Sequence, residues 1–573
     1  MKPENRLIFY FTWFLLATMA IGAEVSLPAT HVQFPVGITV SNKPILSWLD
    51  KESLDLHSSK KHILLVFGME PEDQTPLITA QTVLWNLQYS QSSLQGASIS
   101  VVLDANPDNL PVPSFPPKGK AYNQKETAAA HYLWRFIGSQ GFDLVIDIRR
   151  SSSLEMFTGG KSSALNKELI EGWALKTNSL PENSFAAALV KNKPANMDTV
   201  AAIQMNYPED SATEPARFIS DLLSIRLRNS SVIQHSPARR QLRANTDRTP
   251  VQTARQLAQH YGHNPSIQYI PALAQLSRLH LAKLDNAPKH HTEVVNSLQP
   301  YIQSQKETLG KKVSGVNLAG HLTLAELARK DNNPAIIKLI NSAAELAHNS
   351  KTGKDSPVSG HNQMSDSVFM VCPLLAAAHT LTGNPQYLED CLAHFQYIQK
   401  LCLRKDGIYR HSPQDDAAWG RGNGFPALGL TLTLSWLPED SPAFKNILQA
   451  LRSHIDSLLP HQDPTGMWHQ VIDHPESYRE MTSTCMITFA IARGIRQGWL
   501  EKEAYLPVIQ KSWEAINRRL SNQGELLDVC TGTGKQKNLR NYFDRTAILG
   551  KDARGGAMAL MASTEMAALL QSE

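Results

Sequence analysis

One short run of this chain combines an aromatic ring, a guanidinium and an amide on a glycine-rich turn. It reads Trp-Gly-Arg-Gly-Asn-Gly-Phe over residues 419–425, and an apolar stretch follows it to Trp436. Such a turn at a helix start favours an anion, because free backbone N–H groups and the helix dipole meet there. The planar guanidinium of Arg421 can grip a carboxylate through two parallel hydrogen bonds. The run therefore predicts a binding site for an acidic sugar.

Two acidic residues have a comparable position before apolar stretches. Asp366 opens the run 366–378, and Glu480 opens the run 481–495. Asp366, Arg421 and Glu480 are separated by 55 and 59 residues, a length that suits one helical hairpin. Successive hairpins would place these three residues at the same end of a helical domain, so we expect separate loops to build one pocket.

The elements that must position this pocket are helices. From residue 251 onward, apolar residues recur at helical spacing and are separated by Gly, Pro, Asn and Asp. We expect twelve helices, beginning near residues 251, 268, 289, 313, 333, 365, 385, 421, 441, 479, 500 and 553. The pattern predicts an all-α domain over 251–573.

The preceding part of the chain has a different pattern. Apolar runs at 63–67, 97–103 and 142–148 predict strands, and the segments 77–87 and 128–137 predict helices between them. This alternation is typical of an α/β domain with a mainly parallel sheet, here over 24–235. The polar, turn-rich residues 236–250 are expected to form a linker.

Composition limits the classes of function. The chain has 573 residues, a formal net charge of +4 and 42% hydrophobic residues, as in a folded protein with more than one domain. This small charge gives no support for nucleic-acid binding. A Gly-x-Gly-x-Gly pattern at 420–424 follows no buried strand, so it does not predict a nucleotide site. The histidines between 461 and 474 fit no standard metal spacing, and we expect neither a metal nor a cofactor.

The first residues suggest export. Lys2 and Arg6 precede an apolar run at 7–21, and small residues follow it. This pattern is typical of a signal peptide over 1–23, with an uncleaved anchor as the alternative. We expect a periplasmic or extracellular protein that has no stable membrane insertion after cleavage.

The cysteines number five and lie in the second half of the chain. A single disulfide, such as Cys391 with Cys402, is left open. Buried free thiols are the favoured interpretation, because nothing resembles a dense disulfide framework.

Taken together, the segments 365–373, 419–425, 466–471 and 478–483 resemble the unsaturated glucuronyl and rhamnogalacturonyl hydrolases of glycoside hydrolase families 88 and 105. The resemblance implies that the helices pair as six hairpins in an (α/α)6 barrel. It also implies an acidic oligosaccharide substrate, with a 4,5-unsaturated uronic residue left by a polysaccharide lyase. Such enzymes hydrate the double bond with one carboxyl group, whereas ordinary glycosidases use two.

The resemblance assigns roles to residues of this chain. Asp366, followed by Met370 and Pro373, matches the family's general acid and base, although an N-cap Asp is the alternative. Substrate binding is implied for His411, Trp419, Arg421, Asn423, Phe425, Trp468, Gln470 and Glu480. The loop 530–534 and the segment 552–556 look like further family signatures at the rim of the pocket.

One departure from the family pattern concerns a second acidic residue. Relatives commonly carry it one hairpin before the catalytic Asp, where this chain has Asn317 and His321. Either the substrate differs from the usual one or the activity is weaker. A carbohydrate-binding or scaffold protein without catalysis, and another toroid glycosidase or epimerase, therefore stay open as alternatives.

The α/β domain weakly resembles the zinc carboxypeptidases. Their His-x-x-Glu, Asn-Pro-Asp and later His correspond to the segments 69–72 and 106–108 and to residue 149. Met69 and Arg149 replace the two histidines and cannot bind zinc in their place. The resemblance implies an inactive peptidase fold, and an unrelated α/β domain is the alternative.

Overall fold

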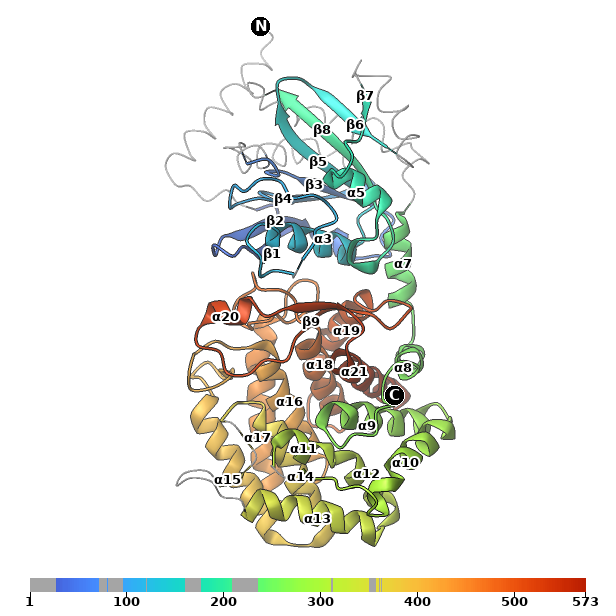
Figure 1. The fold of residues 1–573 in the computed structure, drawn as a ribbon, viewed down its shortest axis with the longest axis vertical. Coiled ribbons are helices and arrows are strands. Elements are labelled where there is room, and N and C mark those ends of the chain that lie inside the picture. Colours follow the sequence, from blue (N-terminus) through green and yellow to red (C-terminus); the bar gives the residue numbers. More distant parts are fainter. Residues whose placement is uncertain are drawn as a thin grey trace.

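The protein has a sheet domain stacked on a helical domain. This computed structural model describes residues 27–71, 80, 96–119, 121–159, 177–208, 235–310, 313–349, 357–359, 361 and 363–572. In Figure 1 the sheet domain lies above the helices, and α7 (Pro237–Thr246) runs between the two. The expected signal peptide, and the expected helix at 77–87 apart from Ala80, lie outside the described residues.

The sheet domain is built on one eight-stranded sheet of order β1-β2-β4-β3-β5-β8-β6-β7. Its strands are β1 (His31–Ile38), β2 (Pro44–Asp50), β3 (Lys61–Val66), β4 (Ala97–Val102), β5 (Leu144–Ser151), β6 (Glu155–Thr158), β7 (Thr177–Ser179) and β8 (Ala201–Pro208). The central strands β4, β3, β5 and β8 are parallel, whereas β1, β2 and β6 join by antiparallel pairing. The expected mainly parallel sheet is confirmed.

Alternating side chains of the central strands supply two cores. In β3, Leu64 and Val66 point into one apolar cluster, and Ile63 and Leu65 point into the other. Three helical segments accompany the strands: α3 (Ala128–Gln140), α5 (Phe185–Lys191) and the short η3 (Pro194–Asn196); η1 (Lys51–Leu54) follows β2. Because both faces of the central strands are buried, β3 and β5 contain the continuous apolar runs 63–66 and 144–146.

The helical domain confirms the expected helix starts to within two residues. Its main helices are α8 (Pro250–Ala258), α9 (Tyr269–Leu284), α10 (Pro288–Ile302), α11 (Gly315–Gly320), α12 (Leu322–Asp331), α13 (Pro334–Asn349), α14 (Ser367–Thr382), α15 (Pro385–Cys402), α16 (Gly420–Leu434), α17 (Pro442–Leu458), α18 (Met481–Arg496), α19 (Lys502–Arg518) and α21 (Ala553–Gln571). Proline at the first position of several helices explains why the starts were readable, since it lacks only an N–H that would be unpaired there.

The helices form a double ring. The inner helices α9, α11, α14, α16, α18 and α21 contact one another in sequence and close the circle, and α10, α13, α15, α17 and α19 pack outside them. Nearly every residue of α14, α16 and α18 is buried. Shorter elements connect these helices along the chain. The turn η5 (Leu459–His461) follows α17, and β9 (Leu526–Cys530), α20 (Leu539–Phe543) and β10 (Ala547–Gly550) lie between α19 and α21 in sequence, with β9 and β10 paired.

The segment 236–250, expected to be a linker, is mostly helical. Helix α7 is capped by Ser236, whose side chain accepts a hydrogen bond from the backbone N–H of Arg239. Arg239 is fully buried, donates to three backbone carbonyls and forms an ion pair with Asp143 at 2.6 Å. These polar residues are therefore ordered by a helix cap and a buried ion pair, and their expected role as a linker at a domain boundary stays a prediction.

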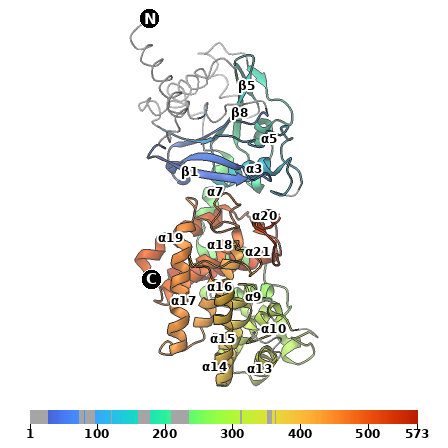
Figure 2. The same cartoon turned by 90° about the vertical axis from the view of Figure 1, so that its left-hand side faces the viewer.

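The two domains share a core. β1 and α3 face the end of the helical domain where β9 and α20 lie (Figures 1 and 2). One buried cluster contains Phe34 and Tyr122 of the sheet domain together with Trp419, Tyr478 and Tyr542 of the helical domain. The helical end that carries the expected pocket is thus covered by the sheet domain.

Two further expectations concern cysteines and membranes. All five cysteines are buried and free, so the interpretation as buried thiols is confirmed and the pairing of Cys391 with Cys402 is wrong. Across the described part of the chain, no helix has the length and apolar character needed to cross a bilayer.

Candidate active site

Asp366 lies directly before α14 and is almost completely buried. Burial raises the pKa of its carboxyl to about 7, although the Arg421 cation acts in the opposite direction. Its Oδ1 lies 3.5 Å from Nε2 of His411. Among the described residues neither of these two atoms has a hydrogen-bond partner. A protonated carboxyl and an imidazole nitrogen thus face each other with free hydrogen-bonding capacity.

His411 is a neutral, oriented imidazole. Burial, assisted by the Arg421 cation, lowers its pKa to about 3. Its Nδ1 lies 3.0 Å from the hydroxyl of Tyr542, and its ring packs on Trp419 with centroids 4.3 Å apart. These contacts leave Nε2 directed toward Asp366.

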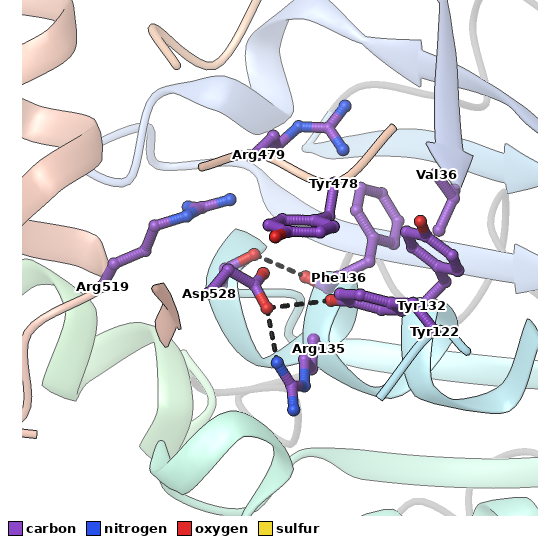
Figure 3. Close-up of a pocket in the computed structure, with 10 residues that line it drawn as sticks. Val36, Tyr122, Tyr132, Arg135, Phe136, Tyr478, Arg479, Arg519 and Asp528 are labelled. Carbon is purple, nitrogen blue, oxygen red and sulfur yellow. Dashed lines mark hydrogen bonds and ion pairs between the residues drawn. The ribbon is translucent and has the colours of Figure 1, made fainter. Parts of the chain in front are cut away.

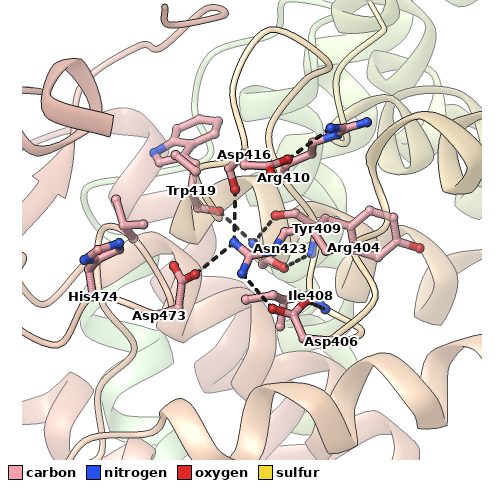
Figure 4. Close-up of polar contacts among 12 residues, drawn as sticks. Arg404, Asp406, Ile408, Tyr409, Arg410, Asp416, Trp419, Asn423, Asp473 and His474 are labelled. Carbon is pink, nitrogen blue, oxygen red and sulfur yellow. Dashed lines mark hydrogen bonds and ion pairs between the residues drawn. The ribbon is translucent and has the colours of Figure 1, made fainter. Parts of the chain in front are cut away.

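The loop that carries His411 is anchored at both ends (Figure 4). Arg404 forms an ion pair with Asp473 at 2.8 Å. The amide of Asn423 accepts a hydrogen bond from the Tyr409 backbone N–H at 2.7 Å and donates to its carbonyl at 2.8 Å. The structure therefore places Asn423 where it orients the loop, with its side chain fully buried.

Arg421 is buried against β9. Its guanidinium donates to the carbonyls of Cys530 at 2.7 Å and Thr531 at 2.8 Å, and it lies 4.6 Å above the ring of Trp419. Both terminal nitrogens are therefore already engaged, and the cation acts on Asp366 and His411 mainly through its charge.

Phe425 belongs to an aromatic group beside these residues. Its ring stacks on Phe369 with centroids 5.4 Å apart, and Tyr269 meets it edge-on at 5.9 Å. The hydroxyl of Tyr269 in turn accepts a hydrogen bond from Nε of Arg554 at 3.3 Å. The segment 552–556 thus reaches the same end of the ring.

Two other expected binding residues donate side-chain hydrogen bonds within the protein. Trp468 donates from Nε1 to the carbonyl of Leu458 at 2.8 Å. Gln470 donates to the carbonyl of Tyr542 at 3.0 Å.

Glu480 caps α18 and ties it to β9. Its carboxylate accepts from the backbone N–H groups of Ser483 at 2.6 Å and Cys530 at 2.9 Å, and from the hydroxyl of Thr482. Glu480 is thus the N-cap of α18.

The position of the missing second carboxylate is occupied by polar residues. Asn317 accepts a hydrogen bond from the Ser314 hydroxyl and donates to the carbonyl of Ile267. His321 is completely buried, and burial lowers its pKa to about 4. Its Nδ1 meets the Asn317 carbonyl at 2.8 Å.

Tyr542 was not among the residues predicted from the sequence, and the loop after β9 carries only a weak sequence signal. Tyr542 lies in an ordinary Asn-Tyr-Phe run with no recognisable spacing. The loop was singled out only as rim, although its first two carbonyls hold Arg421. Within the described ranges, no cluster of three or more His, Cys, Asp or Glu side chains could hold a metal ion.

In the sheet domain, the positions that were compared with the zinc ligands of carboxypeptidases contain an ion-paired group. Arg149 pairs with Asp147 at 2.8 Å and also with Glu70, while Met69 is buried in the apolar core. The Arg149 guanidinium thus forms ion pairs with the carboxylates of Asp147 and Glu70. The resemblance to carboxypeptidases itself stays a prediction.

Comparison with known proteins decides the family of the chain. The model of Glycosyl Hydrolase Family 88 matches residues 245–570. The chain belongs to this family. A solved structure from Klebsiella pneumoniae, described as a possible member of the GH105 family, shares the fold with a TM-score of 0.50 at 21% identity, covering 60% of this chain and 97% of that one.

Curated relatives match a shorter part of this family 88 protein. An unsaturated rhamnogalacturonyl hydrolase, YesR of Bacillus subtilis, is 33% identical over 186 residues, which are 31% of this chain and 52% of the relative. An unsaturated 3S-rhamnoglycuronyl hydrolase of an Alteromonas species is 26% identical over 174 residues, or 28% of this chain and 42% of the relative. The chain thus spans about half the length of these relatives.

Proposed function

We propose that this protein is an exported glycoside hydrolase that removes a 4,5-unsaturated uronyl residue from the end of an acidic oligosaccharide. Membership of family 88 and the names of the matched relatives support the substrate class. The observation that carries the proposal is Asp366, a buried carboxyl with a pKa of about 7. It lies beside an imidazole nitrogen of His411 that has no hydrogen-bond partner within the described part of the chain.

Asp366 acts in two steps. Its proton moves to C4 of the double bond, which leaves positive charge at C5 and on the ring oxygen. The Asp366 carboxylate then takes a proton from the water that attacks C5, so the carboxyl is regenerated. The resulting hemiketal opens and releases the rest of the sugar chain without displacement at C1. The reaction consumes one water and requires a single carboxyl group.

The neighbours of Asp366 have distinct parts in this proposal. His411, neutral at pH 7, hydrogen-bonds the sugar or the attacking water through Nε2. Trp419 and Phe425 offer apolar faces, and the charge of Arg421 attracts the uronate. Asn423, Trp468, Gln470 and Glu480 act as positioning residues. Their contacts hold in place, in that order, the loop at 404–411, the end of α17, α20, and β9 against α18.

The proposal is tested with unsaturated disaccharides from pectin, glycosaminoglycan and ulvan lyases. Loss of the enol-ether absorbance measures hydration directly. We expect the wild type to consume at least one of these substrates and Asp366→Asn to be slower by about 10²–10⁴-fold, the contribution typical of an acid-base group. Asn423→Ala, with a disturbed loop, should lose activity together with stability, whereas Asp366→Asn should stay folded.

The alternative function is carbohydrate binding without turnover, and Asn317 in place of a second carboxylate is the observation that favours it. Retained binding with no loss of absorbance on any substrate would overturn the hydrolase and favour this alternative. Hydrolysis of saturated glycosides would instead point to another toroid glycosidase.

A further inference from the structure

A small buried cavity lies between the two domains, away from Asp366. It has a volume of about 20 Å³. Figure 3 shows the cationic side chains Arg135, Arg479 and Arg519 around it, together with Asp528 and three tyrosines. The sheet domain supplies Tyr122, Tyr132 and Arg135, and the helical domain supplies Tyr478, Arg479, Arg519 and Asp528.

Two of the three arginines are paired with carboxylates. Arg135 contacts Asp528 at 2.5 Å, and Arg479 contacts Asp463 at 2.5 Å. Burial acts to raise the pKa of the Asp463 carboxyl, but Arg479, His469 and the Thr465 hydroxyl together lower it, so the carboxylate keeps its charge. These two pairs cancel, and they leave the third guanidinium as the unbalanced charge.

Arg519 is that guanidinium. Its side chain is 3% exposed, and its Nε and Nη1 are buried without a hydrogen-bond partner among the described residues. Figure 3 shows it extending toward Tyr478 and Asp528 across the cavity. A buried cation without a partner is costly, because it loses its hydration and gains nothing in exchange. Burial accordingly lowers the Arg519 pKa to about 10.

We propose that this cavity binds a monovalent anion of the size of chloride, held by Arg519 between the two domains. The cavity volume is about that needed for one water-sized particle, so sulfate, phosphate and carboxylates are too large. Water would fit but would leave the charge unbalanced. One negative charge restores neutrality to the three arginines and two carboxylates.

The anion would fasten the sheet domain to the helical ring. Arg519 directly follows α19 as its C-cap residue. Arg135 and Tyr122 of the sheet domain line the same cavity. Asp528 of the helical domain contacts both of these residues, since it pairs with Arg135 at 2.5 Å and accepts a hydrogen bond from the Tyr122 hydroxyl at 3.0 Å. Binding therefore stabilises the docked arrangement of the domains by mass action.

Thermal unfolding tests the site at constant ionic strength, with sodium chloride replaced stepwise by sodium gluconate. We expect the Tm of the wild type to rise with chloride by about 1–3 °C and to saturate. Arg519→Met removes the charge and should abolish this dependence. Arg255→Met, at a side chain that is 54% exposed and pairs with Asp285, is the matched control and should keep it.

A second measurement does not depend on any variant. Crystals of the wild type grown in bromide should show an anomalous peak beside the Arg519 guanidinium, and the peak should vanish in gluconate. An absent peak overturns the proposal, and so does a chloride response that is equal in the wild type and Arg519→Met. If Arg519→Met does not fold, the bromide peak alone decides.

Discussion

At the scale of single residues, the candidate site depends on keeping one carboxyl protonated. The Asp366 side chain lies at the start of α14, and the Arg421 cation opposes the effect of burial on its pKa. A carboxyl of this kind can donate a proton near neutral pH, which an exposed Asp cannot.

The same burial makes stability depend on pH. The pKa of Asp366 is about 7 in the folded state and 3.8 in the unfolded state. Between pH 3.8 and pH 7, therefore, the folded protein keeps a proton on Asp366 that the unfolded chain has lost. Wild-type stability should therefore fall, relative to Asp366→Asn, as pH rises from about 4 to 7. The full difference amounts to about 4 kcal/mol.

Urea unfolding of both proteins at pH 5, 6, 7 and 8 measures this difference. It should grow up to pH 7 and level off above it. Asp416→Asn, at a side chain that is 82% exposed, is the control and should show no such growth. A difference between wild type and Asp366→Asn that stays constant with pH would contradict the buried, protonated carboxyl.

Sequence alone indicated Asp366, His411 and Trp419 as members of one site, and the structure brings them together. It did not indicate Tyr542, which lies 131 residues after His411 and orients it. A contact between such distant residues leaves no periodicity or local spacing in the chain. Nor could the sequence show that Arg421 donates to backbone carbonyls, because carbonyls are present at every residue.

At the scale of elements, Glu480 connects α18 with β9. Glu480→Ala would leave the buried N–H groups of Ser483 and Cys530 without acceptors. We expect it to lower the free energy of unfolding by about 3 kcal/mol, from the lost cap and the unpaired groups. Denaturant unfolding measures the change.

Glu503→Ala is a matched control for that variant. Glu503 is exposed in the first turn of α19, so its removal should change stability by less than about 0.5 kcal/mol. Equal stabilities of the two variants would refute the structural role of Glu480.

Helix starts were the most predictable elements, because capping and proline chemistry is local. Ser441 followed by Pro442 marks the start of α17, and the Ser441 hydroxyl accepts from the Phe444 N–H. Helix α7 was not expected for the complementary reason: Arg239 is polar in sequence, but its hydrogen-bond partners lie in distant parts of the chain.

At the scale of the whole molecule, the two domains are joined by buried charge as well as apolar packing. Arg135 of the sheet domain pairs with Asp528 and also donates to the carbonyl of Ala547 at 3.0 Å. Tyr122 stacks on Tyr478 with centroids 5.3 Å apart. The sequence of neither domain predicts this interface, because each domain contributes residues that are isolated from one another along the chain.

Arg135→Met should loosen this interface. It removes the cation that pairs directly with the buried Asp528 carboxylate, and such a loss typically costs about 3–5 kcal/mol. We expect earlier unfolding and faster proteolysis between the domains. The double variant Arg135→Met with Asp528→Asn should recover part of the loss, because it removes both charges. A double variant no more stable than the single one would contradict a direct pairing.

The ring of helices is closed by the last element of the chain. Helix α21 packs on α8 and α9, the first helices of the ring, and on α18. During synthesis the sheet domain leaves the ribosome before the helical domain. The residues that it packs against, such as Tyr478 and Asp528, emerge hundreds of residues later. Until α21 leaves the exit tunnel the ring stays open, and the nascent chain presents unburied apolar surface to chaperones.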